Sequence, residues 1–324
     1  MSYVIDIKDL HKHFGKVKAV NGISLKVKQG EIFGLLGPNG SGKTTTLSML
    51  ATLIKPTRGT AYVDGHSILK EPSRVRAAIG FVFQEPSSDD LLTAKENLYI
   101  HSLLYGVKVN EIEKRMRDAF ALVDLSSRQN SIVRTYSGGM RRRLEIARGL
   151  MHAPKILFLD EPTLGLDPQT RDHLWKYIKR LSTEKGVSVI ITTHYMDEAD
   201  TLCDRVGIIS AGRIIAMGTP GNLKRSLGGD IVTIKMKSPK IAAIRRLKYV
   251  KKVERSGDVI RLTVKDSDIH LQDLLKKAGK VESVDARSPS LNDVFIKYTG
   301  RNIEDNSAEG GYFERMIHAG SSNE

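Results

Sequence analysis

The sequence is poor in cysteine, in aromatic residues and in long apolar runs. Its one cysteine, Cys203, excludes an internal disulfide and any metal cluster built from several cysteines. Apolar stretches such as 156–159 (ILFL) fall far short of the roughly 20 residues of a membrane-spanning helix, and the opening MSYVIDIKDLHK lacks a signal-peptide core. We therefore expect a chain that neither spans a membrane nor is secreted, with the cytoplasm as its simplest compartment.

Negative charge is also scarce. The 324 residues hold 51 Lys and Arg against 37 Asp and Glu, a net charge of +14, and residues 221–300 alone hold 18 against 9. Such an excess suits nucleic acid, an anionic membrane surface or simple solubility, and composition leaves all three open. The hydrophobic fraction of 40% is typical of a globular protein, and the length allows one large domain or two ordinary ones.

The rest of the chain is organised around the stretch 37–44, GPNGSGKT. It fits the phosphate-loop pattern of Gly, four residues and Gly-Lys-Ser/Thr, and it follows an apolar run at 31–36 that suits a buried strand. Residues 44–53 predict a helix, whose first N–H groups and positive dipole end attract anions. The sequence therefore predicts a polyphosphate site in which Lys43 reaches the β- and γ-phosphates and the Thr44 hydroxyl holds Mg²⁺.

A second apolar run, 156–159, ends in two carboxylates, Asp160 and Glu161. In phosphate-loop proteins an Asp at this place helps to hold Mg²⁺, and the next acid can orient and deprotonate the attacking water. The alternative is an acidic strand end before an ordinary turn. The phosphate loop upstream favours the catalytic interpretation.

Apolar strands and amphipathic helices alternate along most of the chain, which predicts an α/β fold with a mostly parallel sheet. Strands are expected at 3–7, 23–28 and 59–64, which alternate apolar and polar residues like antiparallel strands, and as buried segments at 79–83, 155–160 and 187–193. Helices are expected within 91–150, where Asn110 would cap one of them, and at 168–184.

Gly228 and Gly229 mark a boundary near the end of this pattern. The strand and helix order βαββαβ, followed by one more helix, then predicts a small α+β ferredoxin-like domain. We expect a nucleotide-binding domain at 1–220 with a helical subdomain at about 91–150, the small domain at 221–300, and a disordered polar tail at 301–324.

Several short motifs occur in a fixed order: GPNGSGKTT, Gln84, YSGGM at 136–140, ILFLDEPT, GLD at 165–167, and His194. Together they resemble the nucleotide-binding subunit of an ABC transporter, over residues 3 to about 220. The stretch YSGGMRRRLEIARGL and the ending SLNDVFIKYTGR further resemble the ATPase subunits of daunorubicin-type drug-resistance exporters, and nodulation-factor exporters share much of this.

The resemblance implies a role for each matched residue. Glu161 would be the general base, Asp160 would hold Mg²⁺, Gln84 would sense the metal and the γ-phosphate, His194 would contact the γ-phosphate, and Phe14 would stack on adenine. The residues implied to bind ATP are Phe14, Gly37, Pro38, Asn39, Gly40, Ser41, Gly42, Lys43, Thr44 and Thr45, with Ser137, Gly138 and Gly139 acting on the ATP of a second protomer. Two ATP molecules would then lie between two copies of the chain.

Two positions depart from the usual pattern of that family. Met140 stands where Gln is most common, and Tyr136 where Leu is common. The Ser-Gly-Gly donors remain, so we expect the ATP-dependent dimer to form. The contact made by a Gln side chain is in doubt.

These motifs predict an ATPase that powers an ABC exporter of drug, antibiotic or lipid-like cargo through a separate integral-membrane permease, on the cytoplasmic face of the cell membrane. The alternatives are a non-transport ABC ATPase acting on ribosomes or DNA, and an importer ATPase. A single cassette without a long heptad insertion argues against the first, and the ending of the chain argues against the second. No specific nucleic-acid partner is expected.

Overall fold

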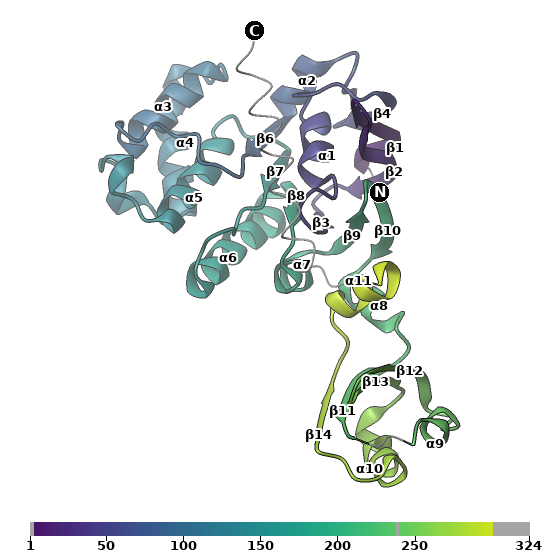
Figure 1. Cartoon of the computed structure of the whole chain (residues 1–324). Coiled ribbons are helices and arrows are strands. Elements are labelled where there is room, and N and C mark those ends of the chain that lie inside the picture. Colours follow the sequence, from purple (N-terminus) through teal and green to yellow (C-terminus); the bar gives the residue numbers. More distant parts are fainter. Residues whose placement is uncertain (1–2, 238–239, 301–324) are drawn as a thin grey trace. The chain divides into compact units, whose positions relative to one another are not determined.

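A computed structural model describes residues 3–237 and 240–300 (Figure 1). The described residues divide into two compact units at the junction of Met217 and Gly218, and each unit has its own hydrophobic core. The expected disordered tail, 301–324, lies outside the described residues.

The N-terminal unit begins with a four-stranded sheet in the order β2-β1-β4-β5. Its strands are β1 (Tyr3–Phe14), β2 (Val17–Lys28), β4 (Arg58–Val63) and β5 (His66–Ser67). The first two strands are longer than expected because their pairing continues, through several register shifts, to Phe14 and Val17. Phe14 therefore ends a strand, and the turn lies at Gly15, whose φ of 55° suits glycine.

The second sheet has six strands in the order β10-β9-β3-β8-β7-β6, and the five from β9 to β6 are parallel. They are β3 (Ile32–Leu36), β6 (Ile79–Val82), β7 (Ile156–Asp160), β8 (Ser188–Thr193), β9 (Arg205–Ser210) and β10 (Arg213–Gly218). Residues of β3, β7 and β8 are buried throughout, as expected for a parallel sheet covered on both faces. Their carboxyl ends meet at one edge, where the phosphate loop leaves β3.

Helices cover both faces of the parallel sheet. They are α1 (Lys43–Leu50), α2 (Pro72–Ala78), α6 (Pro168–Lys185) and α7 (Met196–Leu202). Helix α1 contacts β2 and β4 of the first sheet and β7 and β8 of the second, so it lies between the two sheets, while α6 packs on β8 and α7 on β3 and β8 (Figure 1). This arrangement holds the start of α1 beside the ends of β7 and β8.

A helical lobe lies between β6 and β7 in the sequence (Figure 1). It comprises α3 (Ala94–Leu104), α4 (Val109–Leu122), the short 3₁₀ helices Ser126–Arg128 and Val133–Thr135, and α5 (Gly138–Gly149). The expected apolar face of α4 is confirmed, since Ile112 and Met116 are buried. The expected cap at Asn110 is wrong, because the helix already begins at Val109, after Lys108.

The C-terminal unit has an antiparallel sheet in the order β12-β13-β11-β14. Its elements are α8 (Pro220–Arg225), β11 (Asp230–Lys235), α9 (Ile241–Arg245), β12 (Val250–Ser256), β13 (Val259–Val264), α10 (Ser267–Ala278), β14 (Ser283–Arg287) and α11 (Leu291–Thr299). The βαββαβ order and this strand order are those of a ferredoxin-like fold. The expected fold class is confirmed in both units.

Asp293 of α11 is the buried carboxylate of the C-terminal unit, within residues 218–237 and 240–300. Its two oxygens accept hydrogen bonds from Arg287 at 2.7 and 2.9 Å, and it also contacts Arg261 and closes a capping box with Ser290. Burial alone would raise the pKa of Asp293, but Arg287 and Ser290 outweigh it and hold that pKa below its usual value. This carboxylate fastens α11 to the sheet.

Candidate functional site

The phosphate loop, 37–42, joins the end of β3 to the start of α1. A Cβ atom at Gly37 would lie 2.3 Å from the Ile209 carbonyl oxygen, and one at Gly42 would lie 2.4 Å from that of Ala19. Gly42 also has φ of 104°, in the left-handed region. Only glycine therefore fits at these two places, where neighbouring backbone closes around the loop.

Lys43 is buried beneath this loop. Its ammonium group donates to the carbonyl oxygens of Gly37 at 2.8 Å and Pro38 at 3.1 Å, and it lies 3.0 Å from Glu161 Oε1. Lys43 is 4% exposed and Glu161 is 7% exposed, so solvent screens this ion pair poorly. The positive charge of Lys43 is thus held against the phosphate loop by two carbonyl oxygens and one carboxylate.

Asp160, at the end of β7, connects the start of α1 to β8. Its Oδ1 accepts hydrogen bonds from Thr44 Oγ1 at 3.0 Å and from Thr192 Oγ1 at 2.5 Å. Burial raises the pKa of Asp160 against the opposing effect of these two hydrogen bonds. The carboxylate and the Thr44 hydroxyl are therefore presented together as hard oxygen donors.

Glu161 follows immediately, and its backbone is in an unusual conformation. Its φ of 44° is in the left-handed region, which is uncommon outside glycine. Its side chain accepts a hydrogen bond from His194 Nδ1 at 2.9 Å. Burial alone would raise the pKa of Glu161, but His194 and Lys43 outweigh it and hold that pKa below its usual value. His194 and Lys43 therefore keep Glu161 in its carboxylate form.

The site fits a polyphosphate with a bound Mg²⁺. Ser41 Oγ is buried in the loop and has no hydrogen-bond partner among the described residues, as a donor intended for an external acceptor would be. Within residues 3–237 and 240–300, no group of three or more His, Cys, Asp or Glu could enclose a metal by itself. Thr44 and Asp160 instead suit Mg²⁺, which takes one or two protein oxygens together with phosphate oxygens.

The structure thus brings Lys43, Thr44, Asp160, Glu161 and His194 into one cluster at the carboxyl edge of the sheet. Five other candidate residues lie outside this cluster: Phe14, Gln84, Ser137, Gly138 and Gly139. Phe14 is 37% exposed at the end of β1, with the Lys12 ammonium 4.9 Å from its ring centroid. Gln84 is exposed after β6.

Ser137, Gly138 and Gly139 form the start of α5. Ser137 caps the helix by accepting from Met140 N at 3.3 Å, and Ser137 and Gly138 are exposed. A Cβ atom at Gly139 would lie 2.4 Å from Thr170 Cγ2, so glycine is needed there for close packing on α6. The start of α5 is therefore exposed at Ser137 and Gly138 and packed against α6 at Gly139.

The segment that follows β6, residues 83–90, is fastened to α5. Glu145 accepts hydrogen bonds from Ser87 N at 3.2 Å, Ser87 Oγ at 3.1 Å and Ser88 N at 2.8 Å. Asp90 forms a bidentate pair with Arg141, with both distances 2.9 Å. Movement of this segment would consequently be transmitted to the helix that carries the Ser-Gly-Gly sequence.

Sequence reasoning missed two residues of the site, Thr192 and Arg142. The polar pair at the end of the apolar run VSVIITT could have indicated Thr192. Arg142 is buried, and its guanidinium donates hydrogen bonds to the backbone carbonyl oxygens of Asp160 and Pro162, on either side of Glu161. No local pattern distinguishes it from Arg141 and Arg143.

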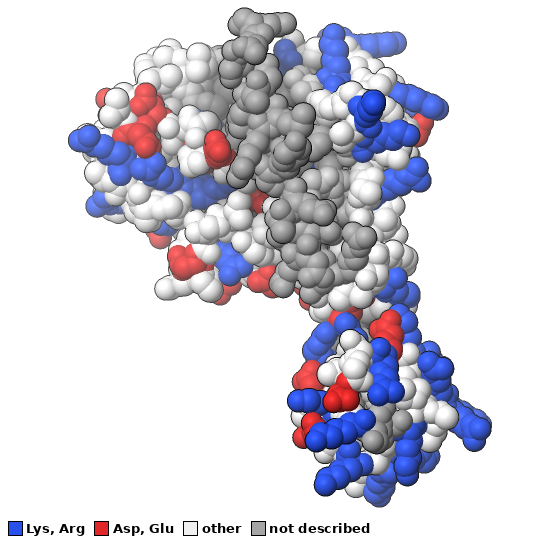
Figure 2. Space-filling view, viewed as in Figure 1, with Lys and Arg blue, Asp and Glu red and all other residues white. Residues whose placement is uncertain are grey.

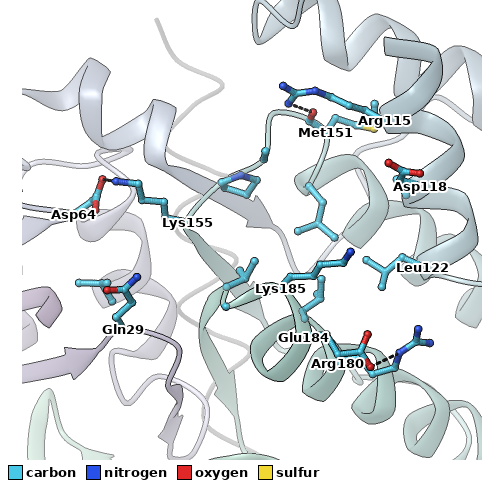
Figure 3. Close-up of a pocket in the computed structure, with 18 of the residues that line it drawn as sticks. Gln29, Asp64, Arg115, Asp118, Leu122, Met151, Lys155, Arg180, Glu184 and Lys185 are labelled. Carbon is cyan, nitrogen blue, oxygen red and sulfur yellow. Dashed lines mark hydrogen bonds and ion pairs between the residues drawn. The ribbon is translucent and has the colours of Figure 1, made fainter. Parts of the chain in front are cut away.

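A cavity of about 960 Å³ lies at the opposite, amino edge of the sheet, beside the starts of β7 and β8 (Figure 3). Its charged side chains largely neutralise one another, since Lys155 reaches Asp64 and Arg180 reaches Glu184. None of the candidate site residues lines it. The functional edge is therefore the one that holds the phosphate loop.

Two family models match the chain. The model described as ABC transporter matches residues 20–164, and the model described as ATP-binding protein DrrA1-3-like, C-terminal domain, matches residues 218–299. The second match covers the α+β unit.

Relatives align over nearly the whole chain. Linearmycin resistance ATP-binding protein LnrL of Bacillus subtilis is 39% identical, over 93% of this chain and 100% of that protein. Daunorubicin/doxorubicin resistance ATP-binding protein DrrA of Streptomyces peucetius is also 39% identical, over 97% of each chain.

Among solved structures, the dimeric post-hydrolysis state of the ATP-binding cassette MJ0796, bound to ADP and Pi, is 30% identical with a TM-score of 0.61, over 66% of this chain and 98% of that chain. The phosphate loop, the two carboxylates at the end of β7 and these matches lead to the same conclusion. The chain belongs to the ATP-binding subunits of ABC transporters and is an ATP-hydrolysing subunit of the exporter type.

Proposed function

We propose that this subunit powers the export of drug, antibiotic or lipid-like molecules through a separate integral-membrane permease, on the cytoplasmic face of the cell membrane. Its relatives LnrL and DrrA, named for resistance to linearmycin and to daunorubicin and doxorubicin, support this class of cargo. In the part of the chain that the structure describes, no helix is long and apolar enough to cross a membrane.

The observation that carries the proposal is the contact of Lys43 with both the phosphate loop and Glu161. On binding ATP, Lys43 would exchange its Gly37 and Pro38 carbonyl partners for phosphate oxygens, and Ser41 and Thr45 would add donors. The same exchange would free Glu161 from its ion pair. Phosphate binding would therefore expose the base only when its substrate is present.

Mg²⁺ would be held by Thr44 and Asp160 and would neutralise charge that develops on the phosphates. Thr192 keeps Asp160 oriented through its hydrogen bond. Glu161 would accept the proton of the attacking water, and His194, 2.9 Å from Glu161, would hold that carboxylate in place and contact the γ-phosphate. Gln84 would sense the metal and the γ-phosphate once its segment moves inward.

Ser137, Gly138 and Gly139 would act on the ATP of a second copy of the chain. Ser137 and Gly138 are exposed at the start of α5, where the first N–H groups of a helix suit an anion. The dimeric state of MJ0796 with ADP and Pi supports such a pairing. Phe14 would stack on adenine, because Gly42 of the loop contacts Ala19, close to the turn that follows Phe14.

The permease would contact helix α3. Several apolar side chains on α3 and next to its two ends are exposed, and we call them the α3 patch: Leu91, Tyr99, Ile100, Leu103, Leu104 and Tyr105. Leu98, on the other side of the helix, is fully buried and serves packing. The patch lies next to the segment 83–90 in the sequence, so a partner on it could follow the movement of Gln84.

Transport in a defined membrane tests the proposal. The chain and its permease would be co-purified and placed in inside-out vesicles with Mg-ATP and a fluorescent amphiphilic drug. We expect drug to accumulate inside these vesicles, and vesicles with the permease alone to serve as the control. Accumulation that does not depend on this chain, or movement in the import direction, would refute the exporter.

A further inference from the structure

Arg142 lies on α5 and is 5% exposed, yet its side chain contacts no carboxylate at hydrogen-bond distance within the described ranges. It donates to backbone carbonyl oxygens instead. Nε reaches Pro162 at 2.7 Å and Nη2 reaches Asp160 at 2.7 Å. One guanidinium thus holds the residue before Glu161 and the residue after it.

The remaining N–H groups of Arg142 connect to a different segment. Nη1 donates to the carbonyl oxygens of Phe83 and Gln84, the latter at 3.4 Å. The planar guanidinium presents five donors in a rigid fork, and a Lys ammonium could not span two segments in the same way. Arg142 therefore joins the Gln84 segment, the backbone around Glu161 and helix α5.

The backbone conformation of Glu161 explains why these hydrogen bonds from Arg142 are needed. A non-glycine residue with φ of 44° persists only where its surroundings over-determine it. Thr192 fixes the Glu161 N–H, through its carbonyl at 3.2 Å and its hydroxyl at 3.0 Å. Arg142 fixes the carbonyl groups on both sides. Without Arg142, the backbone at Glu161 would be free to relax to negative φ and carry the carboxylate away.

We propose that Arg142 is a positioning residue: it holds Glu161 in its left-handed conformation and makes that conformation depend on the position of Gln84. The hydrogen bonds of the Arg142 guanidinium go to backbone carbonyl oxygens. Arg142 acts through Glu161, so this inference rests on the proposed role of Glu161 as the general base.

The test uses the full-length chain with Arg142→Lys and Arg142→Gln, and Arg143→Lys as the matched control. Arg143 lies on the same helix but donates to the Val123 and Asp124 carbonyl oxygens, within the helical lobe. A misplacement of about 1 Å can cost on the order of 100-fold in rate, so we expect kcat to fall roughly 10- to 100-fold in both Arg142 variants. KM for ATP should change less than about threefold, since ground-state binding is untouched. Arg143→Lys should leave kcat within about twofold.

A merely structural role for Arg142 would lower the melting temperature and change kcat and KM together. The decisive measurement is therefore whether the rate losses caused by the Arg142 and Glu161 substitutions add up in a double variant. In a Glu161→Gln background, adding Arg142→Lys should lower the residual single-turnover rate by less than about twofold, because the group that it positions is already gone. Thermal unfolding and ATP binding would verify that each variant is folded.

A folded Arg142 variant with normal kcat, or losses that add fully in the double variant, would overturn the inference. Near-normal hydrolysis by Glu161→Gln alone would instead refute the general-base proposal, so the two failures are distinct. If Arg142→Lys does not fold, Arg142→Gln retains an amide donor for one carbonyl and decides the question.

Discussion

The N-terminal unit buries charged side chains at the carboxyl edge of its parallel sheet, whereas the described part of the C-terminal unit buries Asp293 and keeps its other charges at or near the surface. Lys43, Arg142, Asp160 and Glu161 of the first unit are all at most 7% exposed. Burying charge costs several kcal/mol per ion unless partners compensate, so such a concentration indicates a site where charge acts on a substrate.

The positive charges of the C-terminal unit have a different setting. Residues 221–300 hold 18 Lys and Arg against 9 Asp and Glu, and these cations spread over its surface (Figure 2). Water and salt screen exposed charges, so each contributes little alone. The comparison indicates that the chemistry belongs to the first unit, because buried charges of the kind found around Lys43 are concentrated there.

Removal of the base should give the largest effect. Glu161→Gln is nearly isosteric, but its amide cannot accept the proton, so we expect turnover to fall by about 10²- to 10⁴-fold. ATP should still bind and remain unhydrolysed, and light scattering with Mg-ATP should then detect a dimer. Asp172→Asn, an exposed carboxylate on α6, is the matched control. A strict monomer at saturating ATP would contradict the proposed pairing of two chains.

Removal of the buried lysine should follow closely. Lys43→Ala deletes a preorganised positive contact to the developing phosphate charge, which should cost on the order of 100-fold or more in turnover. Isothermal titration with Mg-ATP and a steady-state ATPase assay would measure binding and rate. Lys55→Ala, an exposed lysine beyond the end of α1, should behave as the parent chain. Near-normal hydrolysis without Lys43 would show that the chemistry lies elsewhere.

The parts of the fold and of the site that the sequence could predict are those that depend on residues close together in the chain. The phosphate loop was predictable because strand, glycine turn and helix are adjacent, and the spacing itself determines where Lys43 and Thr44 lie. Asp160 and Glu161 were predictable because the end of a parallel strand also determines the edge. The ferredoxin-like topology was predictable because the order of strands and helices, βαββαβ, can be recognised along the chain.

Contacts between distant segments were beyond such patterns. Arg142 reaches Asp160 and Phe83 across 18 and 59 residues, and three consecutive arginines look alike until the helix is packed. The extended β1–β2 pairing was missed because register shifts between Ile7 and Leu10 interrupt the alternation on which strand prediction depends. The left-handed φ of Glu161 is likewise a consequence of tertiary contacts.

A third prediction concerns the α3 patch, the exposed apolar surface of the N-terminal unit that would contact the permease. Tyr99 is 40% exposed, so Tyr99→Asp should fold normally but place a charge within an apolar interface. We expect at least about 10-fold less permease to co-purify with this variant. Tyr62→Asp, 38% exposed on β4, is the matched control. Unchanged assembly by Tyr99→Asp would place the docking surface elsewhere.

The smallest effect is expected from loss of the C-terminal unit. Among the described residues, the core of the N-terminal unit is formed by residues that precede the Met217–Gly218 junction, and Lys43, Thr44, Asp160, Glu161 and His194 all belong to that unit. A chain that ends at Met217 should therefore bind Mg-ATP with a Kd within about threefold of that of the full chain.

The separate C-terminal unit should bind DNA or RNA only weakly. This binding should weaken steeply between about 50 and 200 mM salt, because a cationic surface binds nucleic acid largely through the release of counterions. Fluorescence anisotropy with two unrelated duplexes and one single strand would measure it. Tight binding that resists salt and depends on sequence would instead show that the C-terminal unit recognises a specific nucleic acid.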